Sequence, residues 1–174
     1  MCGEFYLADY REVVIEKIDG ITLYVGNPPY VRHHDIQSHW KEWYAATAQE
    51  MRISSSKLAG LHSHFFLATA KHMQPGDVGV YITSSEWLDV NYGASLRRLL
   101  LSRLSLEGLH IFDPASLPFA DAQVTGVITC FNFGVATDTV LINRVCMSAG
   151  LGSLMQGVNI NRAVLESAPR WSSI

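Results

Sequence analysis

Cysteine is scarce in this chain of 174 residues, which contains Cys2, Cys130 and Cys146. None of the three forms the closely spaced pairs that zinc sites and redox motifs use, so the sequence argues against a zinc ribbon or a disulfide framework. No apolar run approaches the roughly 20 residues of a membrane-spanning helix, and the N-terminus has acidic residues where a secretory signal has basic ones. The sequence therefore predicts no membrane span, no secretory signal and a cytoplasmic location.

An excess of basic residues is also missing. The chain has 13 Lys and Arg against 16 Asp and Glu, for a net charge of −3. An autonomous duplex-binding domain usually carries a surplus of basic residues. Any nucleic-acid binding therefore has to come from a local group of residues or from another segment. Apolar residues make up 48% of the chain, which is enough for the core of about one domain.

Short apolar runs alternate with helical patterns along the chain. The run 21–25 predicts a buried strand, because it ends at residues that cannot continue a ladder. Further strands are predicted over 78–83, 109–112, 124–131 and 140–142, and helices over 37–52, 58–72 and 96–104. Strands separated by helices predict an α/β fold with a mainly parallel sheet, whose closely spaced last strands pair antiparallel.

Charged and metal-binding residue types outside the strands have simpler interpretations. Arg97, Arg98 and Arg103 are expected on the polar face of their helix. The seven histidines, His62 and His64 included, match no zinc-ligand spacing, so solvated or core-edge positions are expected and no metal site is predicted. From residue 148 onward, scattered glycines and serines predict a loosely structured tail that leads toward a further domain.

The most informative segment is Asn27-Pro28-Pro29-Tyr30, which directly follows the first predicted strand. In open α/β sheets ligands bind beyond the carboxyl ends of the strands. The two prolines fix a rigid extended path and donate no backbone hydrogen bond, which leaves the Asn27 side-chain oxygen and the Pro28 carbonyl as acceptors for one amino group. Tyr30 adds a flat ring that can stack on a planar heterocycle. The alternative is an ordinary turn that ends a strand.

The segment Val25–Val31 resembles the catalytic motif of the N6-adenine-specific DNA methyltransferases in which Asn-Pro-Pro-Tyr ends a strand. Segments after it also resemble that family, namely 61–77, 80–88 and 118–128, so the resemblance covers residues 9–133. It implies part of a class I S-adenosylmethionine-dependent methyltransferase fold (Rossmann-like). Residues 1–147 would form the catalytic-motif half of the domain and 148–174 the tail.

The resemblance also implies an activity and its residues. S-adenosylmethionine is the expected cofactor, and the expected reaction is methyl transfer to an adenine flipped out of double-stranded DNA, in a restriction-modification or defence system. Asn27, Pro28, Pro29 and Tyr30 match the catalytic motif. Phe119 matches an aromatic residue that contacts the flipped base, Asp9 and Tyr10 match the segment that meets the cofactor adenine, and Arg32 after the tetrad is a candidate for a DNA phosphate or for a solvated loop.

The resemblance departs from the family pattern upstream of the tetrad, where the family has its glycine-rich cofactor loop. Here 26 residues precede Asn27, whereas the missing strand, loop and helix need on the order of 60. A separate chain or segment is therefore expected to supply the cofactor-binding half and the target-recognition domain. A permuted cofactor loop at 149–153 is a second possibility. Other interpretations are a non-catalytic remnant that binds nucleic acid or a partner, and methylation of a protein or a small molecule.

Overall fold

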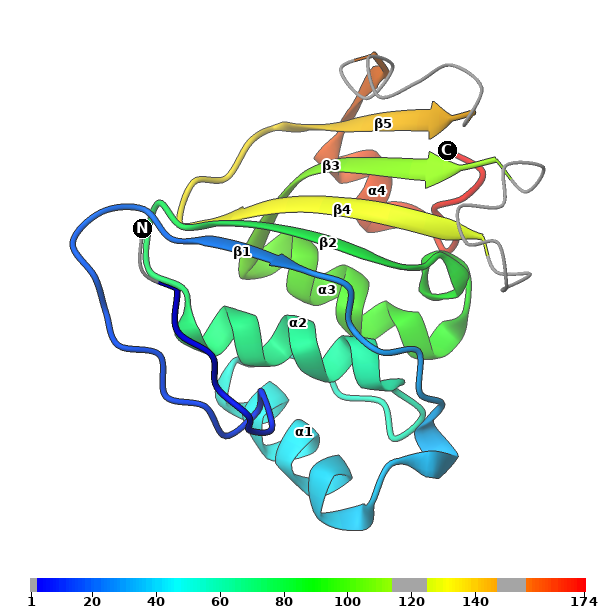
Figure 1. Cartoon of the computed structure of the whole chain (residues 1–174). Coiled ribbons are helices and arrows are strands. Elements are labelled where there is room, and N and C mark those ends of the chain that lie inside the picture. Colours follow the sequence, from blue (N-terminus) through cyan, green and yellow to red (C-terminus); the bar gives the residue numbers. More distant parts are fainter. Residues whose placement is uncertain (1–2, 114–124, 147–155) are drawn as a thin grey trace.

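The structure is a computed structural model that describes residues 3–113, 125–146 and 156–174. Within these ranges, six strands form one sheet in the order β1-β2-β4-β3-β5-β6 (Figure 1). The strands are β1 (Leu23–Gly26), β2 (Val78–Ser84), β3 (Leu104–Phe112), β4 (Gly126–Phe133), β5 (Thr139–Val145) and β6 (Val158–Asn161).

Strand direction confirms the α/β fold and places the antiparallel strands. β1 pairs parallel with β2, and β3 pairs parallel with β5. β4 runs antiparallel to both β2 and β3, and β6 runs antiparallel to β5. Four strands thus point one way and two point the other. One of the antiparallel strands, β4, lies inside the sheet, because the chain returns to fill the gap between β2 and β3.

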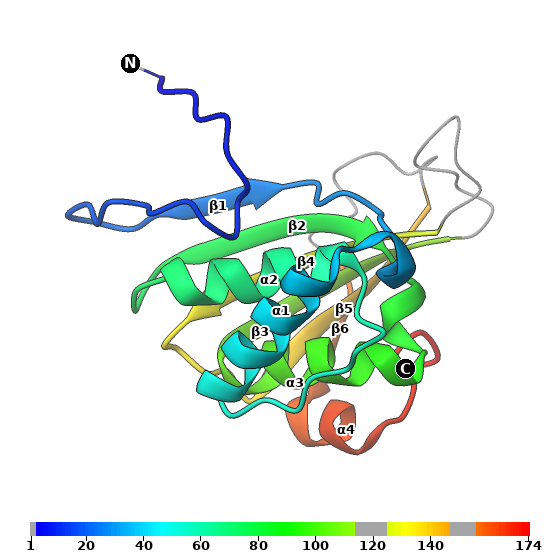
Figure 2. The ribbon, with the colours of Figure 1, turned by 90° about the horizontal axis from the view of Figure 1, so that it is seen from below.

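The helices gather on one side of this sheet (Figures 1 and 2). They are α1 (Ser38–Glu50), α2 (Leu61–His72), α3 (Ala94–Ser102) and α4 (Arg162–Ser167). Short 3-10 turns lie at His33–Asp35, Glu86–Leu88 and Asn91–Gly93. No helix in the described ranges has the length and apolar character needed to cross a membrane.

An aromatic cluster joins α2 to the sheet. The ring of Phe66 on α2 lies 5.0 Å from that of Tyr81 on β2 and 5.5 Å from that of Phe131 on β4, measured between centroids. Gly79 makes this possible, because a Cβ at that position would lie 2.2 Å from Cε2 of Phe131. The helix-facing side of β1, β2 and β4 is therefore a tightly packed core.

The opposite side of β1 and β2 has no such cover among the described residues. Leu23 and Val25 on β1 remain 59% and 70% exposed. Val78, Val80 and Ile82, which alternate with the buried residues of β2, are half-buried. β1 is also the outermost strand of the described sheet, so one row of its backbone groups is unpaired.

The position of β1 is fixed at its start by the buried carboxylate of Asp77. Its Oδ1 accepts from the backbone N–H of Thr22 at 2.8 Å, and its Oδ2 accepts from that of Gln74 at 2.8 Å. Asp77 is 2% exposed, and the neighbouring Val78 N–H donates to the Thr22 carbonyl. The turn before β2 is thereby tied to the residue before β1, which sets where β1 ends.

Arg97 corrects one expectation from the sequence. It does not lie on the polar face of α3 but is buried, with 8% exposure. Its Nη1 donates to the carbonyls of Trp87, Leu88 and Val90 at 2.7, 3.0 and 3.2 Å. These carbonyls belong to the irregular segment after β2, where no ladder satisfies them. Helical periodicity predicts which residue faces inward but not that a loop would place acceptors there. Its neighbour Arg98 is exposed as expected.

The last 19 residues also differ from the expected loose tail. Residues 158–161 form β6 beside β5, and α4 follows. Leu165 and Trp171 are each 1% exposed, and the Trp171 ring packs against that of Trp87 at 6.1 Å. Leu165 and Trp171 anchor this segment, and Ile160, Ala168 and Ile174 also pack against the core. These residues form no pattern that periodicity detects. Residues 147–155 and the glycines at 150 and 152 lie outside the described residues.

We predict that Arg97→Ala lowers the free energy of unfolding by about 3 kcal/mol, because three carbonyls lose a charged donor. Urea denaturation followed by circular dichroism measures this change. Arg98→Ala on the exposed side of the same helix is the matched control and is expected to change stability by less than about 0.5 kcal/mol. Equal effects of the two substitutions would contradict the structural role of Arg97.

Candidate functional site

The tetrad begins immediately after β1, at the carboxyl end of the strand, as predicted. Pro28 is buried, whereas Asn27, Pro29 and Tyr30 are exposed. The chain beyond the tetrad is fixed to α2, because the Leu61 N–H donates to the Val31 carbonyl at 3.0 Å. The tetrad is therefore held at both ends, by β1 on one side and by the start of α2 on the other.

The first half of the tetrad borders a hollow of about 400 Å³. Asn27 and Pro28 line it together with all four residues of β1, and the rest of the wall comes from Tyr10, Ile15, Thr22, Phe65 and Tyr81. Burial raises the pKa of Tyr81 and raises that of Tyr24 to about 12, so both remain neutral phenols at physiological pH. This first hollow is mainly apolar and aromatic, with one amide side chain at its edge.

Tyr10, predicted to meet a cofactor, lies in the wall of the first hollow. Its ring stacks on that of Phe65 with centroids 5.2 Å apart and planes 18° apart. Its hydroxyl lies 3.0 Å from Oγ1 of Thr69, which in turn lies 2.5 Å from the hydroxyl of Tyr81. The structure thus brings Tyr10 and Asn27 to one hollow although they are 17 positions apart in the sequence.

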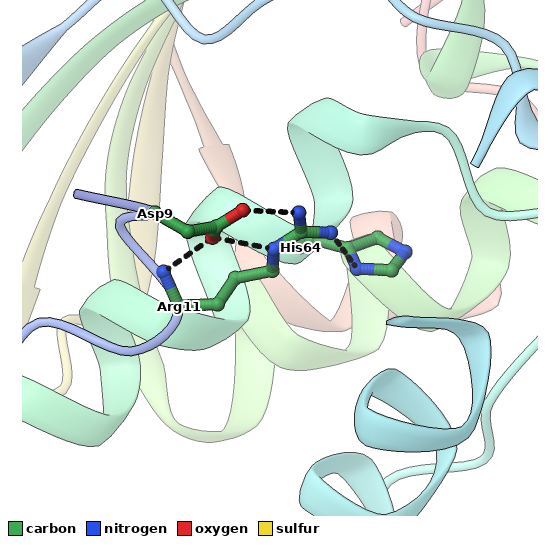
Figure 3. A network of polar contacts seen from close by, with 3 residues as sticks. All are labelled: Asp9, Arg11 and His64. Atoms are coloured by element: carbon green, nitrogen blue, oxygen red, sulfur yellow. Dashed lines mark hydrogen bonds and ion pairs between the residues drawn. The ribbon is translucent and has the colours of Figure 1, made fainter. Parts of the chain in front are cut away.

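Asp9, predicted for the same role, does not line this hollow. Its carboxylate is bound by Arg11, with Nε donating to Oδ1 at 2.7 Å and Nη2 to Oδ2 at 2.5 Å (Figure 3). The hydrogen bonds from Arg11 lower the pKa of Asp9, which keeps the carboxylate ionised. Figure 3 also shows the Arg11 guanidinium reaching Nδ1 of His64 on α2.

The second half of the tetrad borders another hollow, of about 350 Å³. Tyr30 and Arg32 line it, and the remaining wall comes from the start of α2 and from the carboxyl end of β2 with the turns after it. The residues from those elements are Gly60, His62, Ser84, Glu86 and Tyr92. Arg32 is exposed; burial raises the pKa of the Tyr92 hydroxyl, and the charge of Arg32 opposes that rise. Arg32 and Tyr30 therefore line the same hollow, and the phosphate contact suggested for Arg32 stays a prediction.

His62 is a buried polar residue of the second hollow. It is 8% exposed, and its Nε2 has no hydrogen-bond partner among the described residues. Gly60 leaves the space for its ring, since a Cβ on Gly60 would lie 3.0 Å from Cε1 of His62. Burial lowers the pKa of His62 to about 4, so the imidazole is neutral at physiological pH. His62 is therefore buried, whereas the sequence predicted a solvated or core-edge position for it.

The tetrad lies between the two hollows, and this sets what it can do. Asn27 and Pro28 face the first hollow and Tyr30 the second. A ligand group held at the Asn27 oxygen and the Pro28 carbonyl would sit at the boundary, where a ligand of one hollow can reach a ligand of the other. Such an arrangement suits a group transfer that needs alignment rather than a protein nucleophile.

Two predicted features cannot be placed. Phe119 and the glycine pattern at 149–153 lie outside the described residues, so both remain predictions. Within the described ranges no three His, Cys, Asp or Glu side chains are arranged to share a metal ion. Cys130 is half-buried and Cys146 exposed, and both are free thiols.

The sequence did not reveal several residues of the two hollows. Phe65 belongs to an apolar stripe of α2 that predicts core packing, and Tyr81 alternates with other strand residues. Glu86 lies in the segment 80–88 that resembles the family, but the resemblance gave it no role, and Tyr92 lies beyond that segment. Each becomes a site residue because β1 and β2 end side by side, which requires knowledge of strand pairing.

Solved structures of restriction-modification enzymes share this fold. The type IIG restriction endonuclease BpuSI matches with a TM-score of 0.68 over 91% of this chain and 21% of its own, at 16% identity. The type IIL restriction-modification enzyme MmeI, solved in complex with DNA, matches with a TM-score of 0.56 over 80% of this chain and 18% of its own, at 17% identity. The α/β fold of this chain is thus shared with these restriction-modification enzymes.

The Eco57I restriction-modification methylase family matches residues 8–117, and the chain belongs to this family. The type II methyltransferase M.XamI of Xanthomonas campestris pv. amaranthicola is 47% identical over 95% of this chain and 32% of its own length. M.AccI of Acinetobacter calcoaceticus, also a type II methyltransferase, is 26% identical over 90% of this chain and 28% of its own. The chain spans about a third of the length of these curated relatives.

The burial of His62 predicts a pH dependence of stability. Its pKa falls from the ordinary value of 6.5 to about 4 on folding, so its stabilising neutral form is retained above pH 6.5 and stability is lost as pH falls toward 4. Replacing it in His62→Gln should reduce the slope of the unfolding free energy between pH 6 and 4 by roughly 1.4 kcal/mol per pH unit. Urea titrations at several pH values measure the slope. His39→Gln, at an exposed histidine, should leave it unchanged.

Proposed function

We propose that this chain is the catalytic-motif part of a site-specific DNA adenine N6-methyltransferase of a restriction-modification or defence system. The observation that carries the proposal is the position of Asn27-Pro28-Pro29-Tyr30 between two hollows at the carboxyl end of β1, in a chain of a restriction-modification methylase family. The first hollow would take S-adenosylmethionine, and the second would take an adenine flipped out of double-stranded DNA.

The tetrad would activate the adenine amine without a covalent intermediate. This amine is conjugated with its ring and is a poor nucleophile. The Asn27 side-chain oxygen and the Pro28 carbonyl would accept its two hydrogens, draw them out of the ring plane and direct the lone pair toward the methyl donor. The same oxygens would stabilise the positive charge that develops on the nitrogen. Tyr30 would stack on the base, and Phe119 is proposed for the other face.

The first hollow fits the apolar and aromatic part of the cofactor. Tyr10 and Phe65 offer ring surfaces for its adenine, and Asn27 brings an amide to the edge facing the second hollow. When bound, the cofactor supplies an electrophilic methyl group. The described lining has neither a glycine-rich loop nor a carboxylate that could bind a ribose, so the first hollow provides one part of a cofactor site.

The remaining part of the cofactor site is proposed to come from a separate chain or segment, which would also supply target recognition. The length of the relatives supports this, because the matched region is about a third of each. The unpaired edge of β1 and the exposed Leu23 and Val25 also support it, because a further parallel strand with its helix would cover both. Arg32 at the mouth of the second hollow is proposed to contact a DNA phosphate.

The alternative function, a non-catalytic remnant, makes an opposite prediction for cofactor binding. The completed protein is this chain together with the segment proposed to supply the rest of the cofactor site. Isothermal titration of the completed protein with S-adenosylmethionine separates an enzyme from a remnant, because a remnant releases no heat even at millimolar cofactor. Methyl-group analysis of the product by mass spectrometry separates the remaining substrate classes. Detection of methylated glutamine in place of N6-methyladenine would show that the substrate is a protein and not DNA.

We predict that Asn27→Ala and Tyr30→Ala, introduced into the completed enzyme, each reduce methyl incorporation into DNA by orders of magnitude and leave the fold intact. The first removes an acceptor of the amine and the second removes the stacking ring. Incorporation of tritiated methyl groups measures activity, and circular dichroism checks the fold. The exposed His39→Gln variant is the control for substitution itself. Normal turnover in either tetrad variant would refute the assignment.

A further inference from the structure

The segment before β1 lines the first hollow with Tyr10, Ile15 and Thr22, and Tyr10 lies in a short turn that three backbone N–H groups stabilise. The N–H groups of Glu12 and Val13 donate to the Asp9 carbonyl at 2.9 and 3.2 Å. The Arg11 N–H donates to Oδ1 of Asp9 at 3.0 Å. Tyr10, in the middle of this turn, is the residue whose ring enters the wall of the first hollow. The conformation of the turn thus determines where that ring lies.

Arg11 connects the turn to both neighbouring helices. Its guanidinium carbon lies 3.5 Å from the centroid of the Trp40 ring on α1, which is a close cation–π contact. Its Nη1 lies 3.5 Å from Nδ1 of His64 on α2. The Arg11 side chain is 7% exposed, so these contacts are largely shielded from solvent. Arg11 is therefore a fixed point between α1, α2 and the turn.

His64 is suited to receive the arginine. Its ring stacks on that of Tyr44 at 4.6 Å between centroids and on that of Trp43 at 6.0 Å, both on α1. Burial and the adjacent Arg11 lower the pKa of His64 to about 3, so the ring is neutral. A neutral imidazole can accept at Nδ1 and carry its proton on Nε2. The contact with Arg11 is thus a hydrogen bond to a rigidly packed acceptor.

The carboxylate of Asp9 is paired with Arg11 within this arrangement. Oδ1 accepts two hydrogen bonds and Oδ2 one, all from Arg11. This carboxylate balances the charge of Arg11. The ion pair offsets the desolvation cost of burying the guanidinium beside Trp40 and His64. The side chain of Asp9 therefore points its acceptors at Arg11, while the first hollow is reached by Tyr10.

We propose that Asp9 and Arg11 are positioning residues that hold the Tyr10 ring against Phe65 in the wall of the first hollow, with Asp9 acting through Arg11 rather than by contact with the bound cofactor. The proposal rests on the proposed function in that the first hollow is taken to be the cofactor site. It replaces the direct cofactor contact that the sequence suggested for Asp9.

The first test needs no cofactor and uses the 174-residue chain. Nuclear Overhauser contacts between the rings of Tyr10 and Phe65, and hydrogen exchange of the Glu12 and Val13 amides, report the position of the turn. Arg11→Met and Asp9→Asn should each abolish the ring contacts and speed exchange about tenfold, and the double variant should add nothing further. Lys17→Met, which removes an exposed cation from the same segment, should change neither measurement. Unchanged ring contacts in both single variants would overturn the proposal.

Trp40→Leu gives an independent check should a charge substitution impair folding. It removes the ring under Arg11 but leaves the ion pair with Asp9, so the ring contacts of Tyr10 should weaken while the fold is retained. Full retention of these contacts would show that the stacking on Trp40 does not hold the turn, and would count against the proposal.

The second test separates positioning from direct contact by comparing two cofactors. Isothermal titration uses S-adenosylmethionine and its analogue in which the adenine amino group is replaced by oxygen. Asp9→Asn should weaken both by the same factor, about tenfold, with a matching loss in Arg11→Met. A loss confined to the amino-bearing cofactor would assign Asp9 a direct contact and overturn the proposal. These titrations use the chain together with the segment proposed to supply the rest of the cofactor site. Absence of cofactor binding by that unsubstituted protein would count against the proposed function, and the ring contacts would then decide the position of Tyr10.

Discussion

The buried carboxylate of Asp77 is the contact on which the placement of the tetrad depends. It accepts one backbone N–H from the residue before β1 and another from the turn before β2, at 2.8 Å each. A buried carboxylate without such donors would be costly, so these two segments must stay together. The parallel register of Leu23 with Val78 follows directly, and three residues later β1 ends at Gly26. Asn27 is thereby delivered to the edge of the sheet where β2 also ends.

Much of the fold and the central motif could be predicted from the sequence. Asn27-Pro28-Pro29-Tyr30 is detectable because its chemistry is local: two adjacent prolines, two acceptors and a ring are consecutive in the chain. The helices over Ser38–Glu50 and Leu61–His72 are likewise local, since apolar residues recur at helical spacing. Tyr10 was within reach by resemblance, and the structure brings it to the same hollow as Asn27.

What the sequence could not reveal depends on contacts between distant segments. Arg97 is a charged residue in an amphipathic helix, so the sequence predicts a surface position. Its burial follows from three carbonyls that a loop presents to it. His62 is buried because Gly60 makes room for it at the start of α2. The position of β4 between β2 and β3 is likewise a matter of pairing across the sheet. No window of local sequence contains this information.

The uncovered side of β1 has a consequence for how the chain behaves in isolation. Its free N–H and C=O groups and its apolar Leu23 and Val25 form a template onto which any extended apolar segment can add. A second copy of the chain offers the same template, so concentrated preparations are expected to self-associate through this edge. The segments that we propose to complete the cofactor site would compete with that association, and their presence during synthesis would favour a single, monodisperse assembly.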